Sequence, residues 1–546
     1  MKLTTLCLAL NVYKGRYYFF IAKKSSYICR LKGIYFLYKS PFTYSNSLNM
    51  KTRYLKINPL DNVAVAITCL KAGETIQGDE GELIVKEDIP AGHKVTLKEF
   101  SQGENVIKYG YPIGHTIEPM EAGYWISDKQ LKTNLEGLLE YTYHPVNVPL
   151  DIPFENRYFK GYRRKNGDVG IRNEIWIIPT VGCVNGIANQ LAENLRKETD
   201  GQGVDVIKAF PHNYGCSQLG DDHENTKKIL RDMVKHPNAG GVLVVGLGCE
   251  NNQPDVFREF IGEYDEERVK FLVTQQVEGD EVEIGMQLLR EIYAKAKEDR
   301  REDIPLSELR VGLKCGGSDG FSGITANPLL GMFSDYLIAQ GGTSVLTEVP
   351  EMFGSETILM DRCRTKDLFD RTVSLINDFK EYFLSHGEPV GENPSPGNKA
   401  GGISTLEEKA LGCTQKCGKA HVDGVLAYGD RLQVKGLNLL SAPGNDLVAS
   451  TALASCGCHI VLFTTGRGTP FGTFVPTMKI STNTLLATNK PNWIDFNAGV
   501  IVEGEPKESV CERFIDYVIR VASGEPVNNE KKDYREIAIF KTGVTL

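Results

Sequence analysis

The stretch FPHNYGCSQLGDDHEN, residues 210–225, gathers side chains that could do chemistry. It holds His212, Cys216, Asp221, Asp222 and His223 within twelve residues. Three interpretations are open: a metal site built from imidazole, thiolate and carboxylate, a cysteine nucleophile with a histidine base, or a crowded polar loop. The elements around the stretch have to decide among them.

Four cysteines follow apolar runs and stand beside glycines: Cys183, Cys216, Cys249 and Cys315. Ligands bind at the carboxyl ends of strands in α/β sheets, so these positions predict one shared pocket. GLGCEN lacks the third glycine of a dinucleotide fingerprint, because Asn251 takes its place. A reactive thiol, an iron–sulfur cluster and a single Fe²⁺ or Mn²⁺ ion all remain possible, although no C-x₂-C pair occurs.

Three further stretches suit a polyhydroxylated anion. GGSDGFSGITANP is a glycine-rich turn before a predicted helix, where free N–H groups favour a carboxylate. TEVPEMFG places two carboxylates at a strand end, and TTGRGTPFG sets an arginine between glycines for a bidentate grip. The candidate residues in these stretches are Ser318, Asp319, Asn327, Glu348, Glu351 and Arg467.

The pattern of apolar runs predicts an α/β protein with a small β module followed by mostly parallel sheet domains. Short strands with glycine turns come first, and proline-rich stretches mark two breaks. Beyond the first break, continuous apolar strands alternate with amphipathic helices, which indicates parallel sheets covered on both faces. The expected divisions are an extension at 1–49, a β module at 50–135, a linker at 136–160 and α/β domains at 161–392 and 393–546.

Charge and composition exclude several classes of protein. The net charge of −8 argues against nucleic-acid binding, and no apolar run is long enough to span a membrane. Thirteen irregularly spaced cysteines in a long chain are typical of reduced thiols in a cytoplasmic enzyme. Residues 1–49 carry eight basic and no acidic residues, and we interpret them as a non-native or disordered extension rather than a targeting segment.

Long blocks of the chain from residue 50 onward carry a resemblance to a known family. In the β module they are DNVAVA and GHKVTL, and elsewhere they are GYRRKNGDVGIRNE, TVGCVNGIANQ, YGCSQLGDDHENT, GLGCENNQ, CGGSDGFSGITANP, TEVPEMFG, ENPSPGNKAGGISTLEEKALGCTQKCG, LSAPGND, TTGRGTPFGTFVPTMKI and REIAIFKTGVTL. With these blocks the chain resembles the altronate dehydratase family, which galactarate dehydratase and sulfolactate sulfo-lyase resemble in architecture. The β module resembles that family's SAF domain, a β-clip.

The resemblance implies dehydration of D-altronate to 2-dehydro-3-deoxy-D-gluconate during cytoplasmic galacturonate breakdown. It also implies a divalent metal, usually Fe²⁺, and Mn²⁺ is the alternative. Large sheet enzymes of this kind often associate, so we expect a homo-oligomer, a dimer. A metal could stabilise the enediolate that forms when the C2 proton leaves. The alternatives are galactarate dehydration, carbon–sulfur cleavage as in a sulfo-lyase, an iron–sulfur hydro-lyase and a non-catalytic sugar-acid sensor.

Position within the family blocks suggests roles for the candidates. Metal ligands are expected among His93, His212, Cys216, Asp222 and Cys249, and proton-transfer groups among His212, Asp221, His223, Glu348 and Glu351. Ser318, Asp319, Asn327 and Arg467 are expected on the substrate. One departure stands out, because Ser127, Asp128 and Lys129 occupy the place of a histidine-rich stretch in many family members. That pattern is closer to galactarate dehydratase.

Overall fold

The computed structural model describes residues 8–13, 16–23, 26–31, 34–39, 53–79, 81–135, 137–391, 393–543 and 545–546. The chain divides into two units, residues 1–51 and residues 52–546. The described part of the first unit is an antiparallel sheet of β1 (Leu8–Tyr13), β2 (Arg16–Lys23), β3 (Ser26–Leu31) and β4 (Ile34–Lys39) in that order. The interpretation of residues 1–49 as an extension stays a prediction, and much of that segment lies outside the described residues.

Residues 54–132 form the small β module that the glycine-punctuated strands predict, and all its strand pairs are antiparallel. Gly73, Gly92 and Gly103 turn the chain with φ between 80° and 84°, a conformation that favours glycine. The strands are β5 (Tyr54–Leu55), β6 (Val63–Ala66), β7 (Thr75–Gly78), β8 (Gly81–Ile84), β9 (Lys94–Thr96), β10 (Asn105–Lys108), β11 (Tyr111–Thr116), β12 (Trp125–Ile126) and β13 (Leu131–Lys132).

The described residues between 137 and 157 contain no helix or strand, and side chains tie them to the C-terminal domain. Tyr141 Oη donates to Glu356 Oε1 at 2.6 Å, and Tyr143 Oη donates to the Cys363 carbonyl at 2.6 Å. A small antiparallel sheet follows, made of β14 (Tyr158–Arg163), β15 (Val169–Gly170) and β20 (Glu302–Pro305).

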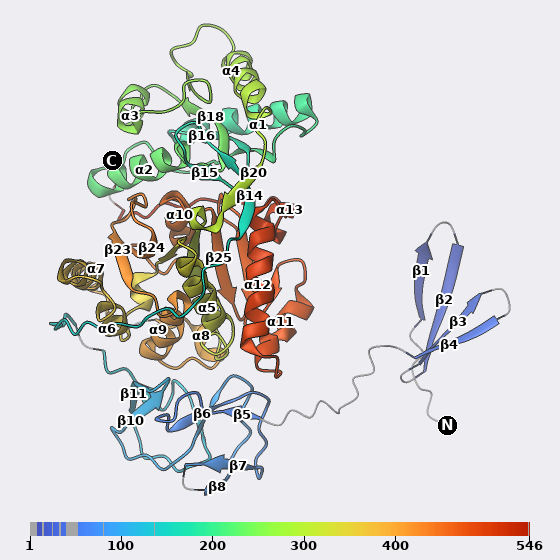
Figure 1. The fold of residues 1–546 in the computed structure, drawn as a ribbon, viewed down its shortest axis with the longest axis vertical. Coiled ribbons are helices and arrows are strands. Elements are labelled where there is room, and N and C mark those ends of the chain that lie inside the picture. The colour runs from blue at the N-terminus through green and yellow to red at the C-terminus, as the bar shows by residue number, and fades with distance from the viewer. Residues whose placement is uncertain are drawn as a thin grey trace. The chain divides into compact units, whose positions relative to one another are not determined.

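The second domain is a parallel four-stranded sheet with helices on both faces (Figure 1). Its strand order is β17 (Val206–Ala209), β16 (Glu174–Pro179), β18 (Ala239–Gly246) and β19 (Val269–Val273). All six residues of β16 are buried, because helices cover the sheet from both sides. Those helices are α1 (Asn185–Thr199), α2 (Gly220–Val234), α3 (Pro254–Ile261) and α4 (Glu281–Ala296).

The C-terminal domain is built on a seven-stranded sheet whose neighbouring strands are all parallel. The order is β23 (Val422–Leu426), β24 (Gly436–Leu440), β22 (Thr343–Leu346), β21 (Arg310–Cys315), β25 (Ile460–Thr465), β26 (Thr477–Ser481) and β27 (Phe496–Asn497). Its helices are α5 (Ala326–Ala339), α6 (Glu356–Met360), α7 (Lys366–Ser385), α8 (Pro396–Ala400), α9 (Leu406–Thr414), α10 (Asp446–Ser455), α11 (Thr484–Asn489), α12 (Lys507–Ala522) and α13 (Asn528–Lys531).

This sheet confirms the predicted fold class and corrects one predicted division. Strands from residues 310–346 and 422–497 lie in the same sheet, so no domain boundary falls at residue 392. The proline-rich stretch there is the connection between α7 and α8, within one domain. Proline and glycine mark a break in regular structure, and such a break can fall inside a domain.

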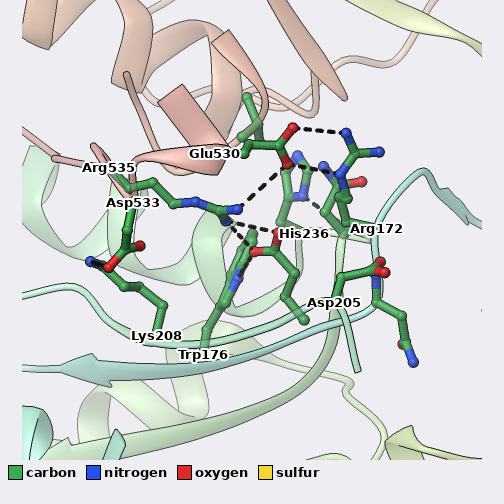
Figure 2. A network of polar contacts seen from close by, with 12 residues as sticks. Arg172, Trp176, Asp205, Lys208, His236, Glu530, Asp533 and Arg535 are labelled. Carbon is green, nitrogen blue, oxygen red and sulfur yellow. Dashed lines mark hydrogen bonds and ion pairs between the residues drawn. The ribbon is translucent and has the colours of Figure 1, made fainter. Parts of the chain in front are cut away.

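Charged side chains join the second domain to the end of the chain (Figure 2). Arg535 donates to both carboxylate oxygens of Glu174, at 2.8 and 2.7 Å, and Arg172 pairs with Glu530 at 2.8 Å. Trp176 Nε1 also donates to Glu174, at 2.7 Å. The side chains of all four charged residues are buried, so the two domains share a desolvated ionic network.

Among the helices that the structure describes, none combines the length and the apolar character needed to cross a membrane.

Candidate active site

Two thiols and a carboxylate meet at the carboxyl end of the C-terminal sheet. Cys315 is the last residue of β21, Glu351 follows β22, and Cys413 lies on α9. The sulfur atoms are 3.2 Å apart, and Glu351 Oε2 lies 3.2 Å from the Cys315 sulfur and 3.1 Å from the Cys413 sulfur. Within the described residues, this is the one group of three acidic, cysteine or histidine side chains whose ligand atoms all lie within 4.8 Å.

Three lysines surround this group. Lys409 Nζ donates to Glu351 Oε1 at 2.6 Å, and Lys416 Nζ donates to the Cys315 sulfur at 3.0 Å and to Glu348 at 2.9 Å. Lys314 pairs with Glu348 and, at 2.8 Å, with Asp446. The three lysines therefore balance three carboxylates, of which Glu348 and Glu351 are buried and Asp446 is partly exposed.

The electrostatics of the cluster keep its carboxylate ionised. Burial alone would raise the pKa of Glu351, but the charges of Lys409, Lys314 and Lys416 outweigh it and lower the pKa to about 2. The hydrogen bond with Cys315, together with burial, raises the pKa of the Cys413 thiol well above its ordinary value. Near neutral pH the cluster therefore holds an anionic Glu351 beside a protonated Cys413.

The backbone at Glu348 is held in an uncommon conformation. Its φ of 72° and ψ of 59° lie in the left-handed region, which costs a non-glycine residue on the order of 1–3 kcal/mol. The carboxylate compensates by accepting hydrogen bonds from Lys416 Nζ at 2.9 Å and the Cys315 backbone N–H at 3.0 Å. Such strain is typical of functional sites, and here it directs Glu348 toward the lysines.

The glycine-rich turn 316–323 lies beside the cluster and carries two of the predicted substrate-binding residues, Ser318 and Asp319, and Asn327 follows on α5. Asp319 accepts from Thr482 Oγ1 at 2.9 Å, while Asn327 donates to the Gly412 carbonyl at 3.0 Å. Ser318 Oγ is buried and makes no hydrogen bond among the described residues. A buried hydroxyl without a partner is costly, so Ser318 is available for a ligand.

The β module of residues 54–132 covers this turn. Lys94 and Lys108, both fully buried, pair with Glu408 of α9 at 2.8 and 2.7 Å. Gly320 packs so closely on the module that an added Cβ would lie 1.8 Å from the Gly92 carbonyl oxygen. The space between the turn, α9 and the module has a volume of about 10 Å³, room for about one water molecule.

A larger cavity of about 690 Å³ opens beside this closed space, between the β module and α8. His93, Trp125, Asp128 and Lys399 are among its lining residues, and Ser127 and Lys129 line it as well. Burial and the neighbouring charge of Lys94 lower the pKa of His93, so its ring is neutral near pH 7. The cavity is large enough for a six-carbon sugar acid.

Helix α8 connects the cavity to the cluster. Asn398 Nδ2 donates to the Ser318 carbonyl at 2.9 Å, and Arg467 Nη1 donates to the Gly397 carbonyl at 3.0 Å. Arg467 is exposed, so its guanidinium can reach an incoming anion. The predicted substrate residues, the two glutamates and His93 thus belong to one region of the molecule.

The other candidates lie in the second domain. Among the described residues, no hydrogen bond or ion pair joins them to the cluster. His212 has both ring nitrogens engaged, with Nε2 2.8 Å from the Pro179 carbonyl and Nδ1 accepting from the Tyr214 N–H at 3.1 Å. No ring nitrogen is left for a metal or a substrate proton, and burial lowers its pKa to about 4.

The other candidate residues of the second domain also lie away from the cluster. Asp222 accepts from the backbone N–H groups of Thr542 and Gly543 at 2.6 and 2.8 Å, which ties the chain end to α2. Asp221 is exposed, and His223 is half-buried. Cys216 and Cys249 are exposed at the ends of β17 and β18. The stretch 210–225 is therefore separate from the cluster of the C-terminal domain.

Sequence analysis missed Cys413 and the lysines as site residues. Lysine is usually interpreted as a solvated surface residue, and a single sequence does not indicate which lysine is buried. A signal was present, because Lys314 interrupts the apolar run of β21, and Lys409 and Lys416 flank Cys413 in the segment LEEKALGCTQKCG. Charged residues inside otherwise apolar or small-residue segments are candidates for a buried polar site.

The fold and the site define a class of protein: an α/β enzyme whose N-terminal β-clip covers a buried cluster of lysines, carboxylates and thiols. Residues 52–134 match the family model of the altronate/galactarate dehydratase SAF domain, and residues 161–297 match that of the second domain of D-galactarate dehydratase/altronate hydrolase. Residues 306–545 match the C-terminal domain of D-galactarate/altronate dehydratase. The chain belongs to the altronate/galactarate dehydratase family.

Curated relatives agree with this assignment. Altronate dehydratase of Bacillus subtilis (strain 168) is 58% identical over 495 residues, which cover 90% of this chain and 99% of that protein. Altronate dehydratase of Escherichia coli (strain K12) is 55% identical, over 90% of this chain and the full length of that protein. Galactarate dehydratase (L-threo-forming) of the same strain is 34% identical, over 86% of this chain and 93% of that protein.

Proposed function

We propose that this protein dehydrates D-altronate to 2-dehydro-3-deoxy-D-gluconate. The observation that carries the proposal is the charge-balanced cluster of Cys315, Glu351 and Cys413 with its three lysines, behind a cavity of sugar-acid size. The two relatives of highest identity described above support altronate as the substrate. Removal of a proton next to a carboxylate creates an enediolate, which needs concentrated positive charge nearby.

The residues divide this work by position. Ser318 and Arg467 hold the substrate carboxylate, because one offers a free hydroxyl and the other an exposed guanidinium. Lys409 and Lys416 supply fixed positive charge that stabilises the enediolate. His93, neutral on the cavity wall, accepts the C2 proton. Asp128 on the same wall, in its protonated form, donates a proton to the C3 hydroxyl, which leaves as water.

The cluster also fits a divalent metal, Fe²⁺ with Mn²⁺ as the alternative. Cys315, Glu351 and Cys413 would hold it, because each offers one ligand atom and thiolate and carboxylate ligands both suit first-row metals. The positive charges of the three lysines already equal the negative charges of the three carboxylates. The two negative charges of the thiolates would therefore be cancelled by one divalent ion. When bound, such an ion would act as a Lewis acid on the substrate carboxylate.

A substrate screen tests the proposal. Protein incubated with altronate, galactarate and sulfolactate, each with and without Fe²⁺ or Mn²⁺, should form a 2-keto-3-deoxy acid from altronate, detected by its carbonyl group. Turnover of galactarate instead of altronate would overturn the substrate and keep the dehydratase class. Absence of turnover with every acid and metal would overturn the class.

Metal content tests the assigned ligands. Cys413→Ser should lower bound iron and altronate turnover together, because serine is a much poorer ligand for iron than thiolate. Cys417→Ser is the matched control. Cys417 is also buried, one helical turn away, but its thiol donates a hydrogen bond to the Thr414 carbonyl and accepts one from Arg362 Nη2. Equal metal loss in both variants would contradict the ligand assignment.

We also propose that the protein works in the cytoplasm as a homodimer. The irregular spacing of the cysteines is typical of free thiols in a reducing compartment. Large sheet enzymes of this kind often form oligomers. Cell fractionation and analytical ultracentrifugation test the two statements separately.

A further inference from the structure

The second domain concentrates its cysteines at one edge of its sheet. Residues 161–297 contain three cysteines, Cys183, Cys216 and Cys249. They follow β16, β17 and β18, which are neighbours in the order β17–β16–β18. Because the three strands are parallel, their carboxyl ends lie at the same edge. Every cysteine of the domain therefore stands on one of three adjacent loops.

Packing does not account for these thiols. All three are exposed, whereas of the other eight described cysteines only Cys69 is exposed and seven are buried. Free cysteine is among the most buried residue types, so three exposed thiols on adjacent loops are unusual.

Hydrogen bonds hold the three loops together. The Gly182 N–H donates to the Tyr214 carbonyl at 3.0 Å, which joins the loops of Cys183 and Cys216. The Ser217 N–H donates to Asn251 Oδ1 at 2.7 Å, which joins the loops of Cys216 and Cys249. An added Cβ at Gly215 would lie 2.0 Å from the Thr180 carbonyl oxygen, so the loops approach as closely as backbones allow.

The loops also present backbone N–H groups at the same edge. Helices α1, α2 and α3 begin directly after the three loops, and none has a side-chain N-cap. Their first N–H groups lack intrahelical partners, and the helix dipoles favour negative charge there. Three thiolates bound to a positively charged inorganic core form an anionic group, and the helix N-termini at this edge would stabilise its negative charge.

We propose that Cys183, Cys216 and Cys249 bind a [4Fe–4S] cluster. A single ion is disfavoured, because these sulfurs are not among the described groups of three with ligand atoms within 4.8 Å. A cubane core places iron and sulfide between the cysteines and so accepts wider spacing. Each thiol loses its proton as its sulfur bonds to one iron, and a core of two ferric, two ferrous and four sulfide ions with three thiolates carries one negative charge.

The second domain has no fourth cysteine, so the fourth iron lacks a thiolate from this domain. Glu250, the one carboxylate on these loops, is buried and already accepts from the N–H groups of Leu247 and Gly248 at 3.0 and 2.6 Å. The fourth iron is therefore open to a water or a small anion. The site is independent of the proposed dehydration centre, which lies on the other sheet.

Anaerobic reconstitution of the full chain with equal ferric and ferrous iron plus sulfide tests the proposal. After desalting, the wild type should show broad visible absorbance and contain about four acid-labile sulfides per chain, with about four irons beyond the single ion expected at Cys315, Glu351 and Cys413. Cys183→Ala, Cys216→Ala and Cys249→Ala should each lower both contents by at least about threefold. The thiols are exposed, so the variants should keep the circular dichroism and melting temperature of the wild type.

Two controls separate this site from other thiols. Cys69→Ala removes an exposed cysteine of the SAF module, and Cys413→Ser removes a thiol of the candidate active site. Both should retain labile sulfide and visible absorbance. A colourless wild type, or sulfide lost in Cys413→Ser but retained in Cys216→Ala, would overturn the proposal. Because the readout is sulfide rather than turnover, failure of altronate dehydration would leave it unaffected.

Discussion

Buried lysines are the distinctive residues of the candidate site. Lys314 and Lys416 are fully buried, and Lys409 is 8% exposed. Desolvation opposes a buried ammonium group, yet the pKa of each of these lysines is raised above its ordinary value, by nearby carboxylates at Lys314 and Lys409 and by Cys315 followed by Glu348 at Lys416. Buried ion pairs rarely improve stability over apolar residues of the same size. Fixed positive charge in a dry site is useful when negative charge develops during a reaction, which favours a catalytic explanation.

Replacement of Glu351 by glutamine tests that explanation. Glu351→Gln should lower altronate turnover by about 100-fold or more, because the carboxylate that contacts both thiols and balances Lys409 is lost. Stability should fall by about 3–5 kcal/mol, since Lys409 is left buried without its counter-charge. Steady-state kinetics and urea unfolding measure the two effects.

Glu356→Gln is the matched control for that substitution. Glu356 is an equally buried carboxylate that pairs with the buried Lys380 at 3.2 Å, outside the cluster. We expect it to lose similar stability and to keep most of its turnover. If the two variants lost turnover equally, Glu351 would have only a structural role.

At the scale of elements, helix α9 fastens the SAF module to the C-terminal domain. Its Glu408 accepts from Lys94 and Lys108 of the module, and their charges lower its pKa to about 2 although burial alone would raise it. Ser404, just before the helix, also accepts from Lys94 at 2.7 Å. One glutamate is thus the shared counter-charge of two lysines from β9 and β10.

Glu408→Gln should therefore loosen the module. Two buried ammonium groups would lose their shared counter-charge, which should cost about 3–5 kcal/mol. We expect faster proteolytic cleavage between residues 137 and 157 and a larger radius of gyration in small-angle scattering. Asp88→Asn, which breaks an exposed pair with Lys71 in the same module, should change neither quantity. Unchanged cleavage in Glu408→Gln would show that other contacts hold the module.

The loop after β17 gives a prediction about pH. His212 has a pKa of about 4 in the folded protein and about 6.5 when unfolded, so the unfolded chain binds more protons between these values. The contribution of His212 to the free energy of unfolding is therefore fully present above about pH 6.5. As the pH falls toward 4, about 3 kcal/mol of this contribution is lost. His212→Gln should therefore show a smaller drop in melting temperature between about pH 7 and pH 4.5 than the wild type. Equal drops would contradict this role.

The sequence predicted the order and type of the helices and strands better than it predicted which strands join the same sheet. Apolar runs and glycine turns indicated the β module and the parallel strands, and strand ends indicated Ser318, Glu348 and Glu351 as neighbours. Periodicity does not reveal which strands join one sheet, so Cys315 was grouped with Cys216 and Cys249 although their sheets differ. The buried lysines escaped prediction because their partners lie far away in sequence, as Lys94 and Glu408 do.

For the whole molecule, the ionic network of Figure 2 joins the second domain to the C-terminal domain. Burial raises the pKa of Glu174 even though Arg535 and Trp176 donate to its carboxylate. The ionised form of Glu174 thus depends on one arginine that comes from the end of the chain. Removal of that arginine should make the cohesion of the two domains sensitive to pH.

Arg535→Met tests this dependence. Without the guanidinium, an ionised Glu174 stays buried and unpaired, which should cost about 3–5 kcal/mol at about pH 8. Because the folded-state pKa of Glu174 is raised, its stabilising contribution is present in acid and is lost as the pH rises through that pKa. The penalty should therefore be smaller at about pH 5, where the carboxyl can take up a proton.

Arg520→Met, which breaks an exposed pair with Glu525, should change stability by less than about 1 kcal/mol at either pH. Calorimetry at both pH values measures the difference, and an equal penalty at both would mean that the network contributes through packing rather than through charge.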